Sequence, residues 1–530
     1  MKIGIDYGTT TTLVSLTSEF RGRTTSKVID IGGDRSGYMR SSVPSVLGVK
    51  KNGSIAVGYE AEKIKEENPG QVVVLRSLKR CLSCDKKGED VGDNCWNPMN
   101  RPFCRGDHKL RIFNHDRSIH ELVGSFIDEI LKQHAVKPIY NDASLKTIGV
   151  AVPAIFGAAP RRTIYSLMLQ KVKDPVKIEV VNEPTAALLA CKDKTLEDEN
   201  GIYAIMDVGG GTTDIVVYEK NGRKLSLFRP CGLMVAGDNV DDVMLHRLFP
   251  KWRERETESD RVLREVRRAK ERLSQLSEVT VLGKKLSRGD FEEIIRPVLS
   301  EIVGALRDEI KTVFDKYKPY SQTRQKFKLR KIYLSGGGSR IPLLMDLIKS
   351  DPVIRILGPE VAFLRNEELY PIYADDLPIV LVALGTSIPK KDFVDTIQNM
   401  LPYSIILIRG DKREAKASLY EEFPVKFSVR VPGDSEVQIL AVDPNAPEAP
   451  VHNLTDELVA TNDQRETVLS ELLKNPGIFD FLINEYNIMW VSKGPPHKRR
   501  RSFPLPWQGG IETALFEKYR KEWRRKHNLN

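Results

Sequence analysis

The chain has 530 residues, of which 41% are hydrophobic and 29% are charged, and its formal net charge is +10. This composition excludes a largely disordered chain, and the length predicts two to four domains. The longest apolar run, from Leu377, has about 12 residues and is too short to span a bilayer, so we expect a cytoplasmic protein without a secretory signal.

The chain opens with an apolar strand and an unusual turn, MKIGIDYGTTTTLVSL. The first apolar segment ends at Asp6, Gly8 suits a tight turn, and Thr9 to Thr12 precede the next apolar segment. A second stretch, YAIMDVGGGTTDIVVYE from Tyr203, repeats this order about 200 residues later, with Asp207 in the place of Asp6. The pair predicts a duplicated domain with a cleft between its halves.

Both turns carry groups that suit a magnesium-bound triphosphate. Glycine, at Gly8 and at Gly209 to Gly211, lets backbone amides approach a phosphate, and the threonine hydroxyls add donors. A carboxylate at each strand end, Asp6 and Asp207, can hold a hydrated magnesium ion. Two unrelated glycine turns are the alternative, and the matching Asp and Thr residues argue against it.

Four of the six cysteines follow directly after Lys79 and Arg80, in CLSCDKKGEDVGDNCWNPMNRPFC. The clustered residues are Cys81, Cys84, Cys95 and Cys104. The polar, glycine-rich sequence between the cysteines predicts an inserted loop over residues 81–108. A loop without a hydrophobic core needs a cross-link to hold its structure. Four thiolates suit a structural zinc ion, with His108 as a replacement ligand. Reduced structural thiols and a redox switch are the alternatives.

A third glycine run, Gly336 to Gly338 in KIYLSGGGSRIP, joins an apolar strand to a helical pattern and offers amides to an anionic or nucleoside group. With this run the order of motifs resembles the DnaK-type chaperones, the seventy-kilodalton heat-shock family. The motifs are GIDYGTTTT, AVPAIFGAAPRR, VVNEPTAALLA, MDVGGGTTD, RAKERLS and LSGGGSRIP. The Asn-Glu-Pro-Thr-Ala-Ala run from Asn182 separates this branch from the wider actin-like superfamily.

The resemblance covers roughly residues 1–388 and implies an α/β fold, a two-lobed actin-like ATPase with duplicated ribonuclease-H-like subdomains. It implies that Thr9 and Thr10 contact the β- and γ-phosphates of ATP. It also implies that Asp6 and Asp207 hold Mg²⁺ through its waters.

The catalytic residues implied by the resemblance are Lys79, Glu183, Asp207 and Thr212. In this assignment Lys79 is the catalytic lysine, Glu183 helps to place water and magnesium, and Thr212 faces the terminal phosphate. Each has a plainer alternative. Lys79 can be a solvated lysine, Glu183 can cap the helix that Pro184 begins, and Asp214 can be an exposed strand carboxylate.

The residues that the resemblance places near the nucleoside depart from the family pattern. Arg267 stands where the family has an acidic residue, and Glu271 stands where it has arginine. A guanidinium can stack on adenine and a carboxylate cannot, so Arg267 and Arg268 are candidates to compensate. A charge-swapped pair of Arg267 and Glu271 would preserve a salt bridge. The nucleotide-binding residues implied by the resemblance, beyond the threonines and Asp6, are Gly8, Gly209, Gly210, Gly211, Thr212, Asp214, Gly237, Lys270, Ser274, Gly337, Gly338, Ser339 and Arg340.

Beyond residue 388 the patterns predict a reduced substrate-binding module. Residues 389–403 form a linker that lacks the leucine run of the family, and 404–450 contain four short strands that resemble the first half of a peptide-binding sandwich. The second half has no evident counterpart. Residues 451–490 are expected to be helical, near Asp463 to Leu473 and Ile478 to Tyr486.

The last segment, residues 491–530, carries eleven Lys and Arg against three Glu. Phe503 and Trp507 lie among the basic side chains, a mixture that suits nucleic-acid phosphates and bases. Docking on a partner protein and mere solubility are the alternatives.

The sequence therefore predicts a chaperone-like ATPase that uses ATP and Mg²⁺ to switch lobe closure and so controls a protein client, with a cochaperone as a further partner. A metabolic kinase of the actin-like superfamily and an ATP-binding scaffold associated with nucleic acid are the alternatives.

Overall fold

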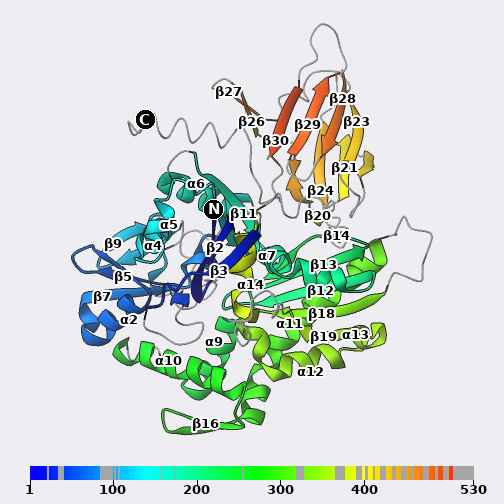
Figure 1. The fold of residues 1–530 in the computed structure, drawn as a ribbon. Helices are drawn as coiled ribbons and strands as arrows, with labels where there is room; N and C mark the ends of the chain where they lie inside the picture. Colours follow the sequence, from blue (N-terminus) through cyan, green and yellow to red (C-terminus); the bar gives the residue numbers. More distant parts are fainter. Residues whose placement is uncertain are drawn as a thin grey trace. The chain divides into compact units, whose positions relative to one another are not determined.

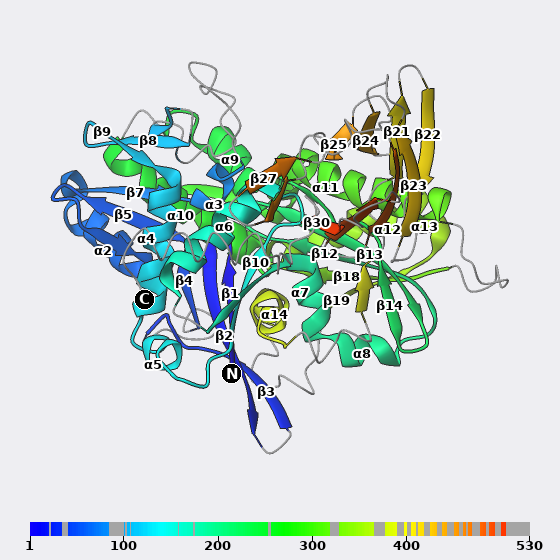
Figure 2. The same ribbon diagram turned by 90° about the horizontal axis from the view of Figure 1, so that it is seen from above.

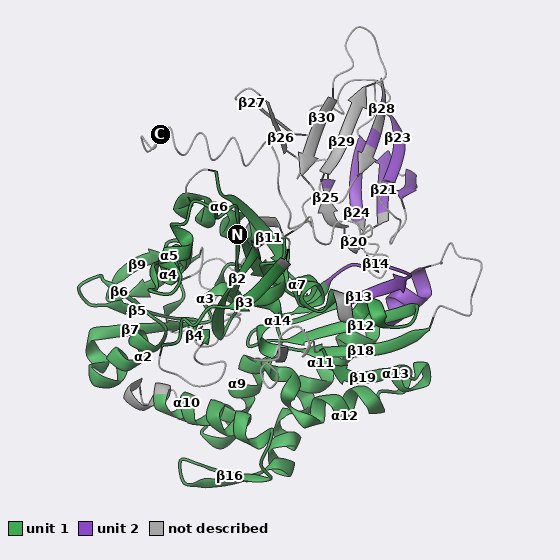
Figure 3. Cartoon of the chain, in the orientation of Figure 1, with its two compact units in different colours: residues 1–216, 231–309, 328–392 green, residues 217–230, 310–327, 393–530 purple. Residues whose placement is uncertain are grey.

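The structure is a computed structural model, and its described residues form two compact units (Figure 3). Unit 1 comprises Met1–Val216, Cys231–Glu309 and Lys328–Asp392, and unit 2 comprises Val217–Pro230, Ile310–Phe327 and Phe393–Asn530. The residues that the structure describes are 1–20, 23–33, 41–83, 100, 103–105, 108–156, 158–172, 175–252, 256–317, 328–364, 377–389, 397–399, 404–409, 412–417, 425–431, 437–442, 450–454, 459–462, 465–468, 477–483, 487–492 and 500–504.

The first sheet of unit 1 is built around the N-terminal strand. Its strands are β1 (Lys2–Tyr7), β2 (Thr11–Phe20), β3 (Arg23–Val28), β4 (Ser42–Pro44), β10 (Thr147–Val152) and β11 (Lys177–Asn182). Their order is β11-β10-β1-β2-β3, with β4 beside β2. Figure 1 labels β2, β3 and β11 of this sheet. Strand β1 runs parallel to β10 and antiparallel to β2. Every residue of β1 is buried, as expected for a strand that is covered on both faces.

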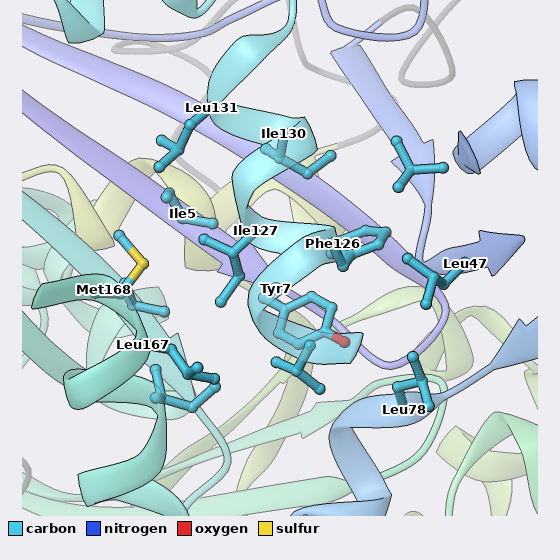
Figure 4. Packing of buried hydrophobic residues seen from close by; sticks show 14 of the residues in the cluster. Ile5, Tyr7, Leu47, Leu78, Phe126, Ile127, Ile130, Leu131, Leu167 and Met168 are labelled. Atoms are coloured by element: carbon cyan, nitrogen blue, oxygen red, sulfur yellow. The ribbon is translucent and has the colours of Figure 1, made fainter. Parts of the chain in front are cut away.

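Helix α4 (Ile119–Lys132) covers the part of this sheet from which the first turn emerges. Its buried residues recur every three or four positions, among them Leu122, Phe126 and Ile130, so the helix presents one apolar face to the core. Phe126 stacks on Tyr7, with ring centroids 5.0 Å apart, and Figure 4 shows the two rings between Ile5 and Leu78. This packing fixes the end of β1, where Asp6 lies.

Smaller elements complete the first half of unit 1. A three-stranded sheet has the order β6-β5-β7, and α2 packs on it. The bounds are β5 (Val46–Lys50), β6 (Ile55–Val57), α2 (Gly58–Glu67), η1 (Pro69–Gln71), β7 (Val72–Arg76), α3 (Leu78–Cys81), β8 (Lys109–Ile112), β9 (His115–Ser118), α5 (Lys137–Tyr140) and α6 (Ala158–Lys171).

The second half of unit 1 repeats the plan of the first. Strands β12 (Gly201–Val208), β18 (Leu329–Ser335) and β19 (Glu360–Phe363) are parallel neighbours, as β1, β10 and β11 are. Strand β12 leads through a glycine turn into β13 (Thr213–Asn221), just as β1 leads into β2, and the first residues of β13 pair with β15 (Cys231–Leu233). The predicted α/β class and the duplication are therefore confirmed.

Helices surround these strands. Helix α14 is apolar throughout and packs beside α7, near β1 (Figure 2). The bounds are α7 (Glu183–Ala190), α8 (Lys192–Glu197), α9 (Gly237–Leu248), α10 (Glu256–Leu273), β16 (Glu278–Val281), β17 (Lys284–Ser287), α11 (Arg288–Lys316), η6 (Gly337–Arg340), α12 (Pro342–Ser350), α13 (Pro352–Leu357) and α14 (Leu377–Thr386). None of the helices in the described part of the chain is long and apolar enough to cross a membrane.

Unit 2 contains two four-stranded sheets near the C-terminal end of the described chain. One has the order β22-β21-β24-β25 and the other has the order β23-β28-β29-β30. The bounds are β20 (Ile397–Asn399), β21 (Ser404–Arg409), β22 (Lys412–Ala417), β23 (Val425–Val431), β24 (Val437–Val442), β25 (Pro450–Asn453), β26 (Val459–Asn462), β27 (Arg465–Val468), β28 (Gly477–Ile483), β29 (Asn487–Ser492), β30 (Arg500–Pro504) and β14 (Lys224–Leu227). Strand β20, inside the expected linker, pairs in parallel with β14.

The expected helices at 463–473 and 478–486 are wrong where the structure describes these residues. β27 and β28 occupy parts of them. Phe479 and Phe481 are both buried, which is the two-residue period of a strand, and Phe481 stacks on Phe427 of β23 at 5.2 Å. The described residues between 404 and 442 contain four strands, as predicted, and the second of them is Lys412–Ala417; residues 418–424, where most of the predicted second strand falls, lie outside the described residues.

Two further expectations for the C-terminal residues need correction. The half-sandwich is wrong, because β28, β29 and β30 build a second sheet on β23. The expected tail begins too early, because β29 ends at Ser492 and Arg500–Pro504 form β30, so some of its arginines belong to a strand. The second aromatic of the tail, Trp507, lies outside the described residues.

Candidate functional site

The two glycine–threonine turns of unit 1 lie against each other. A side chain at Gly210 would place its Cβ 1.5 Å from Thr10 Oγ1, and one at Gly211 would come within 2.4 Å of Thr9. Only glycine permits this approach. The second turn is closed by a bond from the Gly209 amide to the Thr212 carbonyl, at 3.0 Å. The structure thus brings the two predicted turns into one place.

The first turn is braced by a residue that the motif does not contain. Ser45 Oγ donates to the carbonyl of Gly8 at 2.6 Å, and the Ser45 amide donates to the carbonyl of Thr10 at 2.8 Å. Thr12 Oγ1 lies 2.8 Å from the same Ser45 hydroxyl. The Thr12 hydroxyl is therefore hydrogen-bonded within the protein, whereas the buried Thr10 Oγ1 has no hydrogen-bond partner among the described residues.

Lys79 and Glu183, which are 104 positions apart in the sequence, meet as an ion pair. Lys79 Nζ donates to Glu183 Oε1 and lies 3.4 Å from the carbonyl of Ala151. Lys79 is buried, so it is not the solvated lysine of the plainer alternative. Helix α7 does begin at Glu183, but no side chain caps it, and the Glu183 carboxylate is bonded to Lys79 instead.

Around this pair lies what we call the carboxylate cluster, which consists of Asp6, Asp207, Asp214, Glu183 and the single ammonium of Lys79. Burial, followed by repulsion from Glu183, raises the pKa of Asp6 to about 7, although Lys79 opposes the shift. Burial and the neighbouring carboxylates raise the pKa of Asp207 well above its ordinary value. The pKa of Asp214 is raised well above its ordinary value for the same reasons. The cluster therefore carries more buried negative charge than its own cation neutralises.

Such a cluster fits a hydrated divalent cation. Oxygen ligands suit Mg²⁺, and the raised pKa values of Asp6 and Asp207 indicate two carboxylates that a cation would stabilise in their charged form. The described residues contain no group of three or more side chains placed to bind a metal directly. Asp214 is buried and accepts a bond from the amide of Ala154, so the exposed-carboxylate alternative does not hold.

A second set of charges, the α9–α10 charge network, lies beside the Gly209–Gly211 turn. Arg267 of α10 donates to Asp238 Oδ1 at 2.9 Å and to Asp241 Oδ2 at 2.8 Å. Lys270 pairs with Asp241 Oδ1 at 2.6 Å and donates to the carbonyl of Gly237 at 3.1 Å. The expected pairing of Arg267 with Glu271 is therefore wrong, because two carboxylates of α9 bond the guanidinium instead.

Main-chain bonds tie this network to the second turn. The amide of Gly237 donates to the carbonyl of Gly209 at 3.2 Å, and the amide of Asp238 donates to that of Gly210 at 2.6 Å. Ser274 Oγ lies 3.3 Å from the carbonyl of Lys270, within its own helix. Lys270 thus contacts Gly237, and the roles of Gly237, Lys270 and Ser274 toward a nucleotide stay predictions.

The third glycine run lies against Asp207. Gly336 has a φ of +80°, and a Cβ there would lie 2.3 Å from Asp207 Oδ1, so the position requires glycine. η6 follows at Gly337–Arg340, and Ser339 Oγ donates to the carbonyl of Gly336 at 2.7 Å. All three predicted glycine motifs therefore lie around one site.

The cysteine insert lies mostly outside the described residues, and Cys84 and Cys95 are among those outside. Cys81 is buried and Cys104 is partly exposed. His108 Nδ1 lies 3.3 Å from the carbonyl of Cys81. The described residues give no support to zinc, and the four-cysteine site stays a prediction.

Sequence reasoning missed Ser77, Asp238 and Asp241. Ser77 has a φ of 55°, directly before α3, and its hydroxyl donates to Asp238 Oδ2 at 2.7 Å. The available signal was the spacing of Asp238 and Asp241, because residues three apart share one side of a helix.

Comparisons with known proteins agree with this geometry. The chain matches the family described as Hsp70 protein over residues 2–352. It is 28% identical over 442 residues to the "Chaperone protein HscA homolog" of Acidithiobacillus ferrooxidans, and 25% identical over 477 residues to that of Shewanella sediminis. These alignments cover 76% and 86% of this chain. The chain spans 61% and 66% of the lengths of these two relatives.

Proposed function

The chain belongs to the Hsp70 protein family, and we propose that it is a slow Mg²⁺-dependent ATPase that switches the grip of its C-terminal β-sheets on a protein client. The observation that carries the proposal is the meeting of two glycine–threonine turns at the carboxylate cluster, with Lys79 bonded to Glu183 inside it. The printed names of the relatives, which are chaperone proteins, support the same class of function.

The side chains of the site can each perform a separate role in phosphoryl transfer to water. The amides and hydroxyls of the two turns bind phosphate oxygens, and the Lys79 ammonium neutralises charge that grows on the terminal phosphate. The Glu183 carboxylate, held by Lys79, accepts a hydrogen bond from the attacking water and orients it. When bound, Mg²⁺ supplies positive charge to the phosphate oxygens, and Asp6 and Asp207 would hold it through water.

The client-binding half of the proposal is supported by the second unit. Its two four-stranded sheets bury alternating apolar residues, such as Val425, Phe427 and Val429 of β23. A full pair of sheets is a more complete module than the sequence predicted. A cochaperone and a cytoplasmic location stay predictions. The names of the relatives give no support to a nucleic-acid partner, and residues 505–530 lie outside the described chain.

The test is release of inorganic phosphate from ATP and Mg²⁺ with no acceptor molecule present. We expect slow release by the unchanged protein and a large loss in Glu183→Gln. Glu121→Gln is the matched control, because Glu121 is exposed on α4 and pairs only with Arg117 among its described ion pairs. Turnover that requires a small-molecule acceptor would indicate a kinase. Tight ATP binding with no turnover in any variant would indicate a scaffold, and either result would overturn the ATPase proposal.

The client is sought with the same variant. Glu183→Gln should hold ATP without hydrolysing it, so captured proteins should differ between its ATP-bound and ADP-bound forms. An identical set of captured proteins in both forms would contradict nucleotide switching.

A further inference from the structure

Arg80 is a buried arginine of unit 1, and two of its guanidinium nitrogens lack a hydrogen-bond partner among the described residues. Its exposed fraction is 3%, and it lies next to Lys79 in α3. Nη2 donates to the carbonyl of Met234 at 2.9 Å, but Nε and Nη1 have no hydrogen-bond partner among the described residues. A buried guanidinium with unsatisfied N–H groups is costly, so a missing partner is expected.

Among the described residues, the carboxylate that pairs with Arg80 is that of Asp238, and it is already bonded to other groups. Asp238 Oδ1 accepts from Arg267 at 2.9 Å, and Asp238 Oδ2 accepts from the Ser77 hydroxyl at 2.7 Å. Arg80 Nη1 lies 3.9 Å from Asp238 Oδ2, which is beyond hydrogen-bond distance. Asp238 thus forms ion pairs with both Arg267 and Arg80, and Nε and Nη1 of Arg80 have no hydrogen-bond acceptor among the described residues.

The side chain of Arg80 lies at the second phosphate-binding turn. A Cβ placed on Gly211 would lie 2.8 Å from Arg80 Cδ and 2.6 Å from Thr9 Oγ1. The guanidinium is anchored at Met234, directly after β15, which pairs with the start of β13. Arg80 is therefore adjacent to Gly211 of the second turn and to Thr9 of the first.

We propose that Arg80 is a phosphate-binding residue of this site, whose free N–H groups donate to phosphate oxygens of the bound nucleotide. The inference rests on the proposed function, because it takes the nucleotide as the ligand. The planar fork of a guanidinium matches the oxygens of a phosphate, and burial strengthens the charge-assisted bonds. Neither the glycine motifs nor the predicted catalytic residues include this position.

The test compares nucleotide binding by the unchanged protein and by Arg80→Gln, measured calorimetrically with ATP, ADP, adenosine and inorganic phosphate in the presence of Mg²⁺. We expect Arg80→Gln to lose about tenfold to a hundredfold in affinity for ATP, the range for one or two charge-assisted hydrogen bonds. Adenosine has no phosphate, so its affinity should not change. Inorganic phosphate alone shows whether the site binds the anion without the nucleoside.

Arg111→Gln is the matched control, since Arg111 is an exposed arginine of the same unit that pairs with Asp116 at 3.4 Å. An equal loss for ATP and adenosine, or no loss for ATP, would overturn the inference while the proposed function stands. If Arg80→Gln does not fold, Arg80→Lys carries the test. It keeps the charge and should lose ATP affinity selectively, and an unchanged ratio of ATP to adenosine affinity would count against the inference. Failure of the unchanged protein to bind ATP would overturn the proposed function and this inference together.

Discussion

Two buried groups of charges lie side by side in unit 1, and they are balanced differently. The carboxylate cluster contains four carboxyl groups and, among the described residues, one ammonium, that of Lys79, and the pKa values of Asp6, Asp207 and Asp214 are raised. In the α9–α10 charge network, two carboxylates meet two cations at 2.6 to 2.9 Å.

The difference separates a site that needs a ligand from one that is complete. Unbalanced buried negative charge costs free energy in the ligand-free protein, and an incoming cation can recover it. A balanced network has little to gain from a ligand and serves to hold elements together. We therefore expect substitutions in the carboxylate cluster to affect mainly ATP hydrolysis, and substitutions in the α9–α10 charge network to affect mainly the free energy of unfolding.

The largest effect is expected for Lys79→Ala in the cluster. The variant removes the one described ammonium of the carboxylate cluster, which is the partner of Glu183, so ATP hydrolysis should fall by roughly 10²- to 10⁴-fold. Single-turnover phosphate release measures it, and Lys132→Ala, on the exposed end of α4, is the control. Hydrolysis within twofold of the unchanged rate would remove Lys79 from the catalytic role.

A smaller effect, on stability instead of chemistry, is expected for Asp241→Asn in the network. Arg267 and Lys270 would lose a buried negative charge that both contact, and the free energy of unfolding should fall by about 3–5 kcal/mol. Urea unfolding of the ligand-free protein measures it against Asp116→Asn, whose carboxylate is exposed. A loss below about 1 kcal/mol would mean that the network is not a stabilising feature.

The sequence predicted well the features that depend on residues close together in the chain. A carboxylate, glycine and threonine at fixed spacing after an apolar strand indicate a turn and its chemistry, so Asp6 and Asp207 could be paired from the residue pattern alone. The duplication followed from the same repeat. Their roles toward ATP stay predictions, since the fold positions these side chains without showing a ligand.

The parts that failed depend on contacts between distant residues. The family pattern suggested a charge-swapped pair of Arg267 and Glu271, but Asp238 and Asp241 of another helix bond the guanidinium. In the C-terminal residues, the apolar spacing of GIFDFLI also fitted a helix, and only pairing with β23 decides for a strand. Neither outcome can be obtained from one segment alone.

The cluster should also give the ligand-free protein a characteristic pH dependence. The pKa of Asp6 is raised from 3.8 to about 7, so the folded chain holds a proton that the unfolded chain releases in this range. The resulting stability is fully present below about pH 4 and is lost as the pH rises through about 7. For one proton, the slope is at most about 1.4 kcal/mol per pH unit.

This slope is measured by urea unfolding between pH 4.5 and 7.5 in the presence of a chelator. Asp6→Asn should have a shallower slope than the unchanged protein, and added Mg²⁺ should stabilise the unchanged protein more at pH 7.5 than at pH 4.5. Asp116→Asn, which removes an exposed carboxylate, should keep the original slope. Equal slopes for the unchanged protein and Asp6→Asn would show that Asp6 is ionised throughout this range.

The smallest effect is expected for an ion pair that also involves α10 but lies at the surface. Arg264 bonds Glu66 of α2 at 3.0 Å, and the Glu66 side chain is 55% exposed. Water competes for both groups, so Glu66→Gln should change the free energy of unfolding by less than about 1 kcal/mol, with a further decrease of the effect in high salt. Urea unfolding alongside Asp241→Asn compares the two pairs on one helix. A cost equal to that of Asp241→Asn would mean that burial does not set the strength of these contacts, and the contrast between network and surface would have to be abandoned.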